Sequence, residues 1–258
     1  MILDALTREA AAFGLEIARI SGVFLAAPIL WTSAPMQVRA GLVLALAFIS
    51  HGASHASTMP LASFENVAVA IPGELFIGVA MGLVVRFCIA SVEVAGDIMS
   101  PLIGFSAATL FDPHTQAHES PVTKILHTLC VLLLLLLGVH RILLGALMGS
   151  FHAIPVGTLV HPEFATAHIV ELSARTIVTG FRLALPVVAT LLVIQLGLAF
   201  VSRAAPSLQI FSIGFALCMV VGSIIIIGSL PELAREIEVD LAQIGTRLDA
   251  VLTAIAGV

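Results

Sequence analysis

Long apolar segments separated by short polar stretches run through most of the chain. Apolar segments cover roughly 10–31, 40–49, 67–94, 125–151, 177–201 and 208–230, and a further one ends near Phe111. Several have about 20 residues, the length that a helix needs to cross the hydrocarbon core of a bilayer. The segment at 125–151 contains VLLLLLLGV and gives the strongest conventional signal of a membrane span. We therefore predict an all-α membrane protein, with room for roughly six to eight spans.

The end of the chain has a different pattern. From Pro231 onward, apolar residues recur at steps of three and four, and charged residues occupy the other positions. The apolar positions are Leu233, Ile237, Leu241, Ile244, Leu248, Val251 and Ile255. This spacing predicts an amphipathic C-terminal helix over 231–258. Such a helix could lie on the membrane, on its own protein or on a partner subunit.

Composition strengthens the membrane assignment. Hydrophobic residues make up 59% of the chain, charged residues 10%, and the mean hydropathy is +1.13. The formal net charge is -5 and the basic residues form no cluster, so nucleic-acid binding is not expected. The three cysteines are far apart in apolar sequence and indicate neither a disulfide framework nor a metal site. Asp4 and Glu9 stand where a signal peptide needs positive charge, so we expect this end to be retained.

Charged residues interrupt the apolar segments. They are Glu16, Arg19, Glu74, Arg86, Glu93 and Asp97. Each would cost about 2.5 to 3.5 kcal/mol at a lipid-exposed helix centre, so most must face protein or water. Glu16 and Arg19, three apart, could neutralise each other, whereas Glu93 and Asp97 are like charges four apart. We expect an external cation, water or a neighbouring subunit to serve the second pair.

Prolines and glycines within the same segments indicate bent, closely packed helices. Pro72 with Gly73 and Glu74 breaks the segment that begins at 67, and Pro101 and Pro186 lie inside others. Two glycine pairs at four-residue spacing would allow helices to approach closely. These pairs are Gly78 with Gly82 and Gly145 with Gly149.

A search for catalytic motifs finds none. The sequence has no phosphate-binding glycine loop, no G-x-S-x-G elbow and no H-E-x-x-H pair, so we expect neither enzymatic activity nor a cofactor. His51 with His55, and His114 with His118, have a spacing that could bind a metal ion. Both pairs lie in sequence typical of loops, and solvated histidines are the favoured interpretation.

Several motifs together resemble the FliR/SctT family of type III export-gate subunits. The specific ones are GFSAATLFDP at 104–113 and RAAPSLQIFSIGF at 203–215. They are accompanied by APIL at 27–30, GELFIGVAMGLVVRF at 73–87 and the apolar sequence from 183. The form SAATLFDP is closer to the flagellar pattern than to the injectisome pattern. SPLIG at 100–104 departs from the family by lacking a polar residue two positions before the glycine.

The resemblance implies a non-enzymatic subunit of the flagellar export gate in the bacterial inner membrane, within the basal body. One such chain joins five FliP-like and four FliQ-like chains in a cone through which unfolded proteins pass, with FlhB-like and FlhA-like proteins as further partners. The fold it implies is a FliP-like part at 10–175, a FliQ-like hairpin at 177–230 and the helix at 231–258. The charges listed above would then face neighbouring subunits and an aqueous axis.

The resemblance also assigns the segment 104–121 as a plug that fills the pore at rest. Its residues are Gly104, Phe105, Ser106, Ala107, Ala108, Thr109, Leu110, Phe111, Asp112 and Pro113. Phe105, Leu110 and Phe111 can exclude water from a constriction, and Asp112 before Pro113 favours the end of a helix. An ordinary loop between helices is the alternative interpretation.

Two alternatives remain at the level of function. A secondary transporter with broken helices could use Glu74, Arg86, Glu93 and Asp97 as a substrate or proton site near the membrane midplane. Within the family, the chain could belong to an injectisome export gate instead of a flagellum. Arginines flank most segments on both sides, so the distribution of basic residues does not predict the topology.

Overall fold

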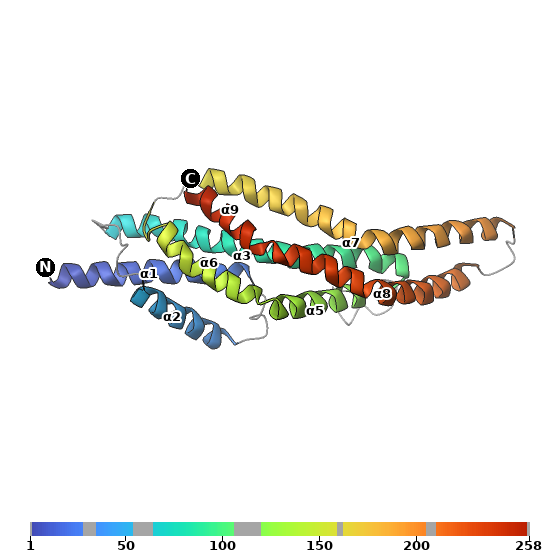
Figure 1. The fold of residues 1–258 in the computed structure, drawn as a ribbon, viewed down its shortest axis with the longest axis horizontal. Helices are drawn as coiled ribbons and strands as arrows, with labels where there is room; N and C mark the ends of the chain where they lie inside the picture. The colour runs from blue at the N-terminus through green and yellow to red at the C-terminus, as the bar shows by residue number, and fades with distance from the viewer. Residues whose placement is uncertain are drawn as a thin grey trace. The chain divides into compact units, whose positions relative to one another are not determined.

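Helices make up the regular structure of this chain (Figure 1). The computed structural model describes residues 2–27, 35–53, 64–105, 120–158, 162–204 and 210–256, and no strand occurs in these ranges. The helices are α1 (Ile2–Ala26), α2 (Met36–Ala53), α3 (Phe64–Ile103), α5 (Pro121–Leu136), α6 (Val139–Ala153), α7 (Pro162–Ala204), α8 (Ile210–Ala242) and α9 (Ile244–Ala256). The prediction of an all-α membrane fold is confirmed.

Three helices are longer than the sequence pattern predicts. The prediction that Pro72, Gly73 and Glu74 interrupt their segment is wrong, because α3 runs through them for 40 residues. Glu74 is buried and bonded inside the chain, so it does not need a break that would expose it to water. Likewise, α7 has 43 residues and passes through Pro186, and α8 passes through Pro231. A helix of 40 residues is about 60 Å long, roughly twice the thickness of a bilayer's hydrocarbon core.

Fewer membrane spans are present than the six to eight for which the chain has room. Within the described ranges, three helical stretches are long and apolar enough to cross a membrane: Val67–Ile103, Thr166–Arg203 and Gly214–Ala256. A fourth is possible if α5 and α6 count as one broken span. The strongest predicted span, 125–151, is in fact these two helices, bent by 61°. Gly138 between them has a φ of 69°, a left-handed conformation that suits glycine and ends α5.

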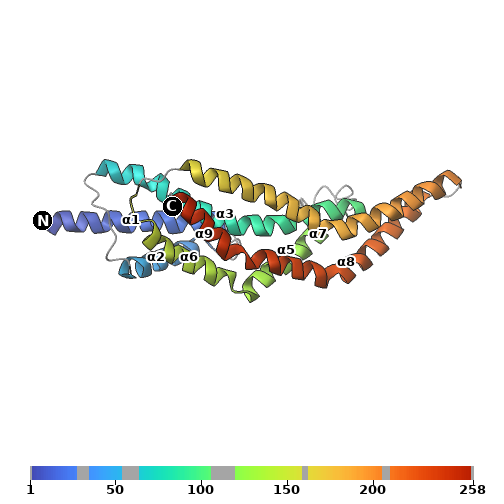
Figure 2. The ribbon, with the colours of Figure 1, turned by 45° about the horizontal axis from the view of Figure 1, so that its top comes forward.

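The chain divides into two compact units. Unit 1 comprises Met1–Phe87, Gly138–Ser173 and Ala242–Val258. Within it, α1 lies beside α2 and α6 packs against α9, as the two views agree (Figures 1 and 2). All seven apolar positions predicted for the tail are buried. Four of them, Ile244, Leu248, Val251 and Ile255, belong to α9, and the other three belong to α8. The apolar stripe of the tail is therefore covered by the chain itself.

Glycines bring α1 and α3 into close contact within unit 1. A Cβ atom added to Gly78 would lie 2.0 Å from the carbonyl oxygen of Arg19, and one added to Gly82 would lie 2.7 Å from the Cβ of Ala26. The predicted close approach at Gly78 and Gly82 is confirmed. The same prediction is wrong for Gly145 and Gly149, where an added Cβ would meet nothing within 4 Å.

Unit 2 comprises Cys88–Leu137 and Ala174–Leu241, and it contains the antiparallel pair formed by the later part of α7 and by α8 (Figure 2). Gly180 of α7 packs against the backbone of Ser91, and Gly222 of α8 packs against Ile103, so both helices approach α3 closely. Their other faces are apolar and exposed in this chain. The exposed side chains include Phe181, Leu192, Val193, Leu196, Phe200, Val220, Ile224 and Ile227.

Candidate functional site

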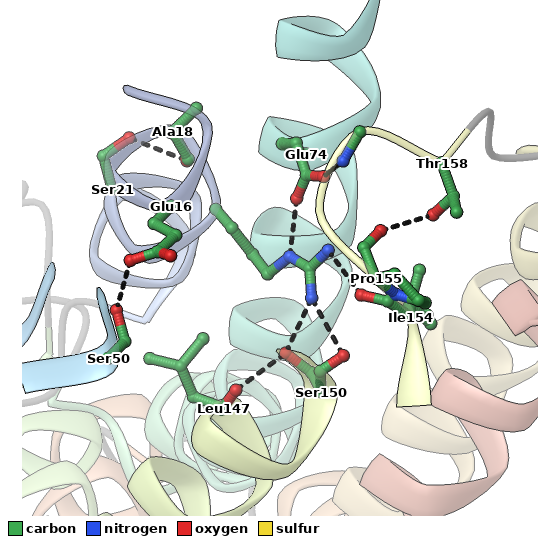
Figure 3. A network of polar contacts seen from close by, with 12 residues as sticks. Glu16, Ala18, Ser21, Ser50, Glu74, Leu147, Ser150, Ile154, Pro155 and Thr158 are labelled. Atoms are coloured by element: carbon green, nitrogen blue, oxygen red, sulfur yellow. Dashed lines mark hydrogen bonds and ion pairs between the residues drawn. The ribbon is translucent and has the colours of Figure 1, made fainter. Parts of the chain in front are cut away.

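A buried ion pair belongs to a network of polar contacts within unit 1 (Figure 3). The Arg19 side chain is 0% exposed and its Nε donates to Glu74 Oε2 over 2.6 Å. Its Nη1 donates to the carbonyl oxygen of Ser150 over 2.9 Å and to the Ser150 hydroxyl over 3.2 Å. Its Nη2 donates to the carbonyl oxygen of Ile154 over 3.0 Å. We call Arg19, Glu74, Ser150 and Ile154, together with Gly157, the Arg19 cluster.

The second oxygen of Glu74 is also satisfied. The backbone N–H of Gly157 donates to Glu74 Oε1 over 2.8 Å. Both carboxylate oxygens therefore have donors, which a buried carboxylate needs in order to stay charged. Gly157 has a φ of 86°, a conformation that glycine adopts readily, and this turn brings its N–H to the carboxylate.

Local structure explains why the arginine reaches this position. Ser150 and Ile154 lie at the C-terminal end of α6, where the carbonyl groups of a helix carry a partial negative charge. The Ser150 carbonyl oxygen also accepts a hydrogen bond of 2.9 Å from the Ile154 N–H. The guanidinium of Arg19 supplies donors to two of these carbonyls and lies 4.7 Å from the centre of the Phe151 ring. The arginine thus joins α1 and α3 to the end of α6.

Glu16 has partners other than Arg19, so the pairing that their spacing allowed is wrong. Glu16 is 1% exposed and accepts a hydrogen bond of 2.8 Å from the Ser50 hydroxyl of α2. Its other oxygen lies 3.3 Å from His51 Nδ1. Although Arg19 is one turn away on α1, it is directed toward Glu74 and α6 instead. Tertiary contacts determine the partners of Glu16 and Arg19, and helical spacing alone does not predict them.

The carboxylates of unit 2 are more accessible. Glu93 Oε1 lies 2.9 Å from His127 Nδ1, with side-chain exposures of 23% and 39%. Asp97 is exposed and accepts a hydrogen bond of 2.8 Å from the Thr123 hydroxyl. Both partners belong to α5 of the same chain, so each carboxylate has a neighbour within the chain. Their contact with a neighbouring subunit stays a prediction. Arg86, about two turns before Glu93 and three before Asp97 on α3, is half-buried.

Two residues assigned to the plug fall within the described part of the chain. Gly104 follows α3 with a φ of 99° and packs against the ring of Phe215, and Phe105 is half-buried. The other eight, Ser106 to Pro113, lie outside the described residues, as do His55, His114 and His118. Within unit 2, Gly104 also borders a groove of about 480 Å³. Its lining includes Leu102, Ile103, Gln195, Leu198, Ser202, Phe215 and Cys218.

The described residues contain no group of three or more histidine, cysteine, aspartate or glutamate side chains arranged to hold a metal ion. His51, one of the histidines considered for such a role, is engaged with carboxylates of α1. The sequence analysis did not find Ser150 or His127, both of which bond charged residues. Neither stands out in sequence, because each lies in an apolar helix more than 30 residues from its partner.

Comparison with known proteins identifies the class. The sequence model of the bacterial export proteins, family 1, matches residues 10–244, and the chain belongs to this family. Within it, the chain is 31% identical to the flagellar biosynthetic protein FliR of Escherichia coli K12, over 84% of this chain and 83% of that protein. It is 29% identical to FliR of Bacillus subtilis 168, over 84% of this chain and 85% of that protein. It is 27% identical to FliR of Caulobacter vibrioides, over 85% of this chain and 88% of that protein. The resemblance to FliR inferred from sequence motifs is confirmed.

Proposed function

We propose that this chain is a non-enzymatic subunit of the flagellar protein export apparatus in the bacterial inner membrane. The observation that carries the proposal is the family match over 10–244, together with similarity to flagellar FliR proteins over most of their length. The flagellar role, in preference to an injectisome, rests on the names of these relatives. A FliR deletion strain expressing this chain should regain motility, and a strain lacking the injectisome counterpart should not regain secretion. The reverse result would favour the injectisome.

The helices support a role inside a larger assembly. Helices such as α3 and α7 are far longer than a bilayer's hydrocarbon core requires, and α7 and α8 present exposed apolar faces. In our proposal, FliP-like and FliQ-like chains cover these faces, five and four of them for each copy of this chain. The segment 10–175 takes the place of a FliP-like part and the segment 177–230 that of a FliQ-like hairpin. FlhB-like and FlhA-like proteins are further partners.

Purification tests the assembly. A gate subunit should be recovered as a stable species when FliP-like and FliQ-like chains are expressed with it. A secondary transporter would instead be stable alone and active as a single chain or small homo-oligomer. Glu74 opposes the transporter interpretation, because both of its oxygens are engaged by Arg19 and Gly157 and do not remain for a substrate.

The segment 104–121 is the plug in this proposal. It begins where Gly104 leaves α3 in a left-handed conformation, beside the end of the α7 and α8 pair. Its apolar residues would exclude water from the pore at rest, and an arriving unfolded protein would displace them. Weak apolar contacts suffice for this opening and closing, and no covalent chemistry is needed.

Deleting Ser106 to Glu119 tests the plug. The assembled gate should then leak ions or small molecules, which conductance across a bilayer or sensitivity of cells to small solutes would detect. A matched control replaces the same residues with an equal number of serines and glycines, which keeps the length but removes the apolar side chains. Unchanged permeability of assembled gates in both variants would remove the plug assignment.

Glu93 and Asp97 offer a test of subunit contacts. Asp97 is exposed and Glu93 is half-buried in this chain, so both carboxylates can meet a neighbouring subunit. Replacing both with leucine should impair assembly with FliP-like and FliQ-like chains, as measured by the yield of the intact complex. Normal complex formation would count against a role for these two carboxylates at a subunit contact.

A further inference from the structure

A histidine lies between two carboxylates where α1 packs on α2 in unit 1. His51 Nε2 is 3.2 Å from Glu9 Oε2, and His51 Nδ1 is 3.3 Å from Glu16 Oε1. Glu9 and Glu16 are seven residues apart on α1, which places them on one face, two turns from each other. Phe13, between them on the same face, contacts the imidazole ring edge to face at 5.5 Å between ring centres.

The protonation state of the ring follows from its two neighbours. A neutral imidazole carries one N–H and can donate to one acceptor, while its other nitrogen has a lone pair. Here both ring nitrogens face carboxylate oxygens, so a neutral ring would direct a lone pair at one of the two anions. An imidazolium donates from both nitrogens and satisfies both carboxylates.

Burial makes the charge on Glu16 dependent on its neighbours. Glu16 is 1% exposed, and a buried carboxylate is stable as an anion only with compensating charge and hydrogen bonds. The Ser50 hydroxyl supplies a hydrogen bond without a charge. Arg19, the next cation along α1, donates to Glu74 and to α6. His51, whose Nδ1 lies 3.3 Å from Glu16 Oε1, is a group that can bring a positive charge to this carboxylate.

We propose that Glu9, His51 and Glu16 form a proton-binding site. Glu9 is 63% exposed and links the site to water, His51 is 27% exposed and carries the proton, and Glu16 holds it from the buried side. The other charged residues of the two helices are Asp4, Arg8 and Arg19 in α1 and Arg39 in α2. Arg8 is exposed beside Glu9, Arg19 donates to Glu74, and Arg39 lies about three turns along α2 from His51. Loss of the proton removes two ion pairs between α1 and α2. The packing of these helices therefore weakens when the ring loses its proton.

Nitrogen NMR of the histidine rings tests the site directly. The full chain is labelled with ¹⁵N-histidine, purified with its export-apparatus partners and compared with a His51→Gln variant, whose missing signals identify His51. At neutral pH we expect His51 to show two protonated ring nitrogens in the wild type and to lose one of them in Glu16→Gln. His152→Gln is the matched control, because His152 is exposed and contacts only the Met148 carbonyl oxygen in the described structure. A singly protonated His51 in the wild type, or a spectrum unchanged by Glu16→Gln, would overturn the proposal.

Thermal unfolding at a series of pH values gives a second measurement. The melting temperature of the wild type should fall when pH is raised far enough to remove the proton from His51, whereas His51→Arg, with a permanent charge, should lose that part of the pH dependence. If His51→Gln does not fold, the comparison of the wild type with His51→Arg still decides. Identical pH dependence in these two proteins would contradict the proposed site, whatever the role of the chain in export.

Discussion

Two glutamates on the same helix have different surroundings. Glu74 and Glu93 both belong to α3, and both interrupt apolar sequence. Glu74 is 1% exposed and accepts hydrogen bonds from Arg19 Nε and from the backbone N–H of Gly157, so it is bonded to two other segments of unit 1. Glu93 is 23% exposed in unit 2 and lies beside His127, itself 39% exposed. An identical side chain in similar sequence is thus part of the interior in one place and near the surface in the other.

This contrast indicates different roles. Glu74 accepts from Arg19, which also donates to the end of α6, so the pair holds α1, α3 and α6 together, and its burial keeps it from a partner. Glu93 and the exposed Asp97 retain access to solvent, so they can change partners at low cost. Charges inside apolar helices are therefore not one functional class, and the degree of burial separates structural ones from accessible ones.

The largest effect is expected at the Arg19 cluster. Arg19→Met leaves the buried Glu74 without its counter-charge, with only the Gly157 N–H as donor, and removes the arginine donors from the carbonyls of Ser150 and Ile154. We expect it to lower the free energy of unfolding by about 3 to 5 kcal/mol. Chemical unfolding of the purified assembly measures the loss, with Arg141→Met, an exposed arginine of α6, as the control. The double variant Arg19→Met/Glu74→Met should be more stable than Arg19→Met, since no unpaired charge remains. Equal stability of Arg19→Met and the wild type would show that the buried pair contributes nothing.

The next largest effect concerns the contact that positions Arg19. Gly78→Ala would place a Cβ atom 2.0 Å from the backbone oxygen of Arg19, so α1 and α3 must move apart. We expect a loss of about 1 to 3 kcal/mol in the free energy of unfolding. Gly145→Ala is the matched control, since an added Cβ meets nothing within 4 Å there. Alanine has the higher helix propensity, so the control should be neutral or gain up to about 1 kcal/mol. Similar behaviour of the two variants would contradict the close contact.

A smaller effect is expected at the start of α5, where unit 2 receives the chain from the proposed plug. The Ser120 hydroxyl accepts a hydrogen bond of 3.1 Å from the backbone N–H of Thr123 and also contacts Ser100. Ser120→Ala should cost about 0.5 to 2 kcal/mol in the free energy of unfolding, because it removes the N-cap. Ser120→Asp retains an acceptor for the cap and should recover most of that loss. If both substitutions have the same effect, the hydroxyl does not act as a cap.

The smallest effect on folding is expected at Glu93 itself. Glu93→Gln should lower the free energy of unfolding by about 0.2 to 1 kcal/mol, since a half-exposed pair gains little from its charge. Added salt should reduce even this difference. Glu74→Gln, measured beside it, should cost several times more because Arg19 then lacks its counter-charge. Comparable losses for the two substitutions would mean that burial does not separate the two glutamates.

Sequence periodicity predicted the elements better than their bounds. The stripe from Leu233 to Ile255 predicted a helix and the residues on its buried face, because apolar side chains at this spacing must be covered together. The break inferred at Pro72, Gly73 and Glu74 was wrong, since a helix in a bundle can continue where its polar groups find partners. The bend at Gly138 was missed for the opposite reason. Its flanks are so apolar that 125–151 resembles one continuous span, and the left-handed turn depends on one residue.

For the charged residues, the sequence determined that Arg19, Glu16 and Glu74 had to avoid lipid, because the cost of burying an unpaired ion follows from its chemistry alone. Only the tertiary structure decided the partners. Arg19 joins Glu74, 55 residues away, and the end of α6, more than 130 residues away, in preference to Glu16 on its own helix. A guanidinium can donate hydrogen bonds to any acceptors that lie around it, and how closely the helices pack determines which acceptors do. That distance is set by glycines such as Gly78, whose effect appears only when two helices meet.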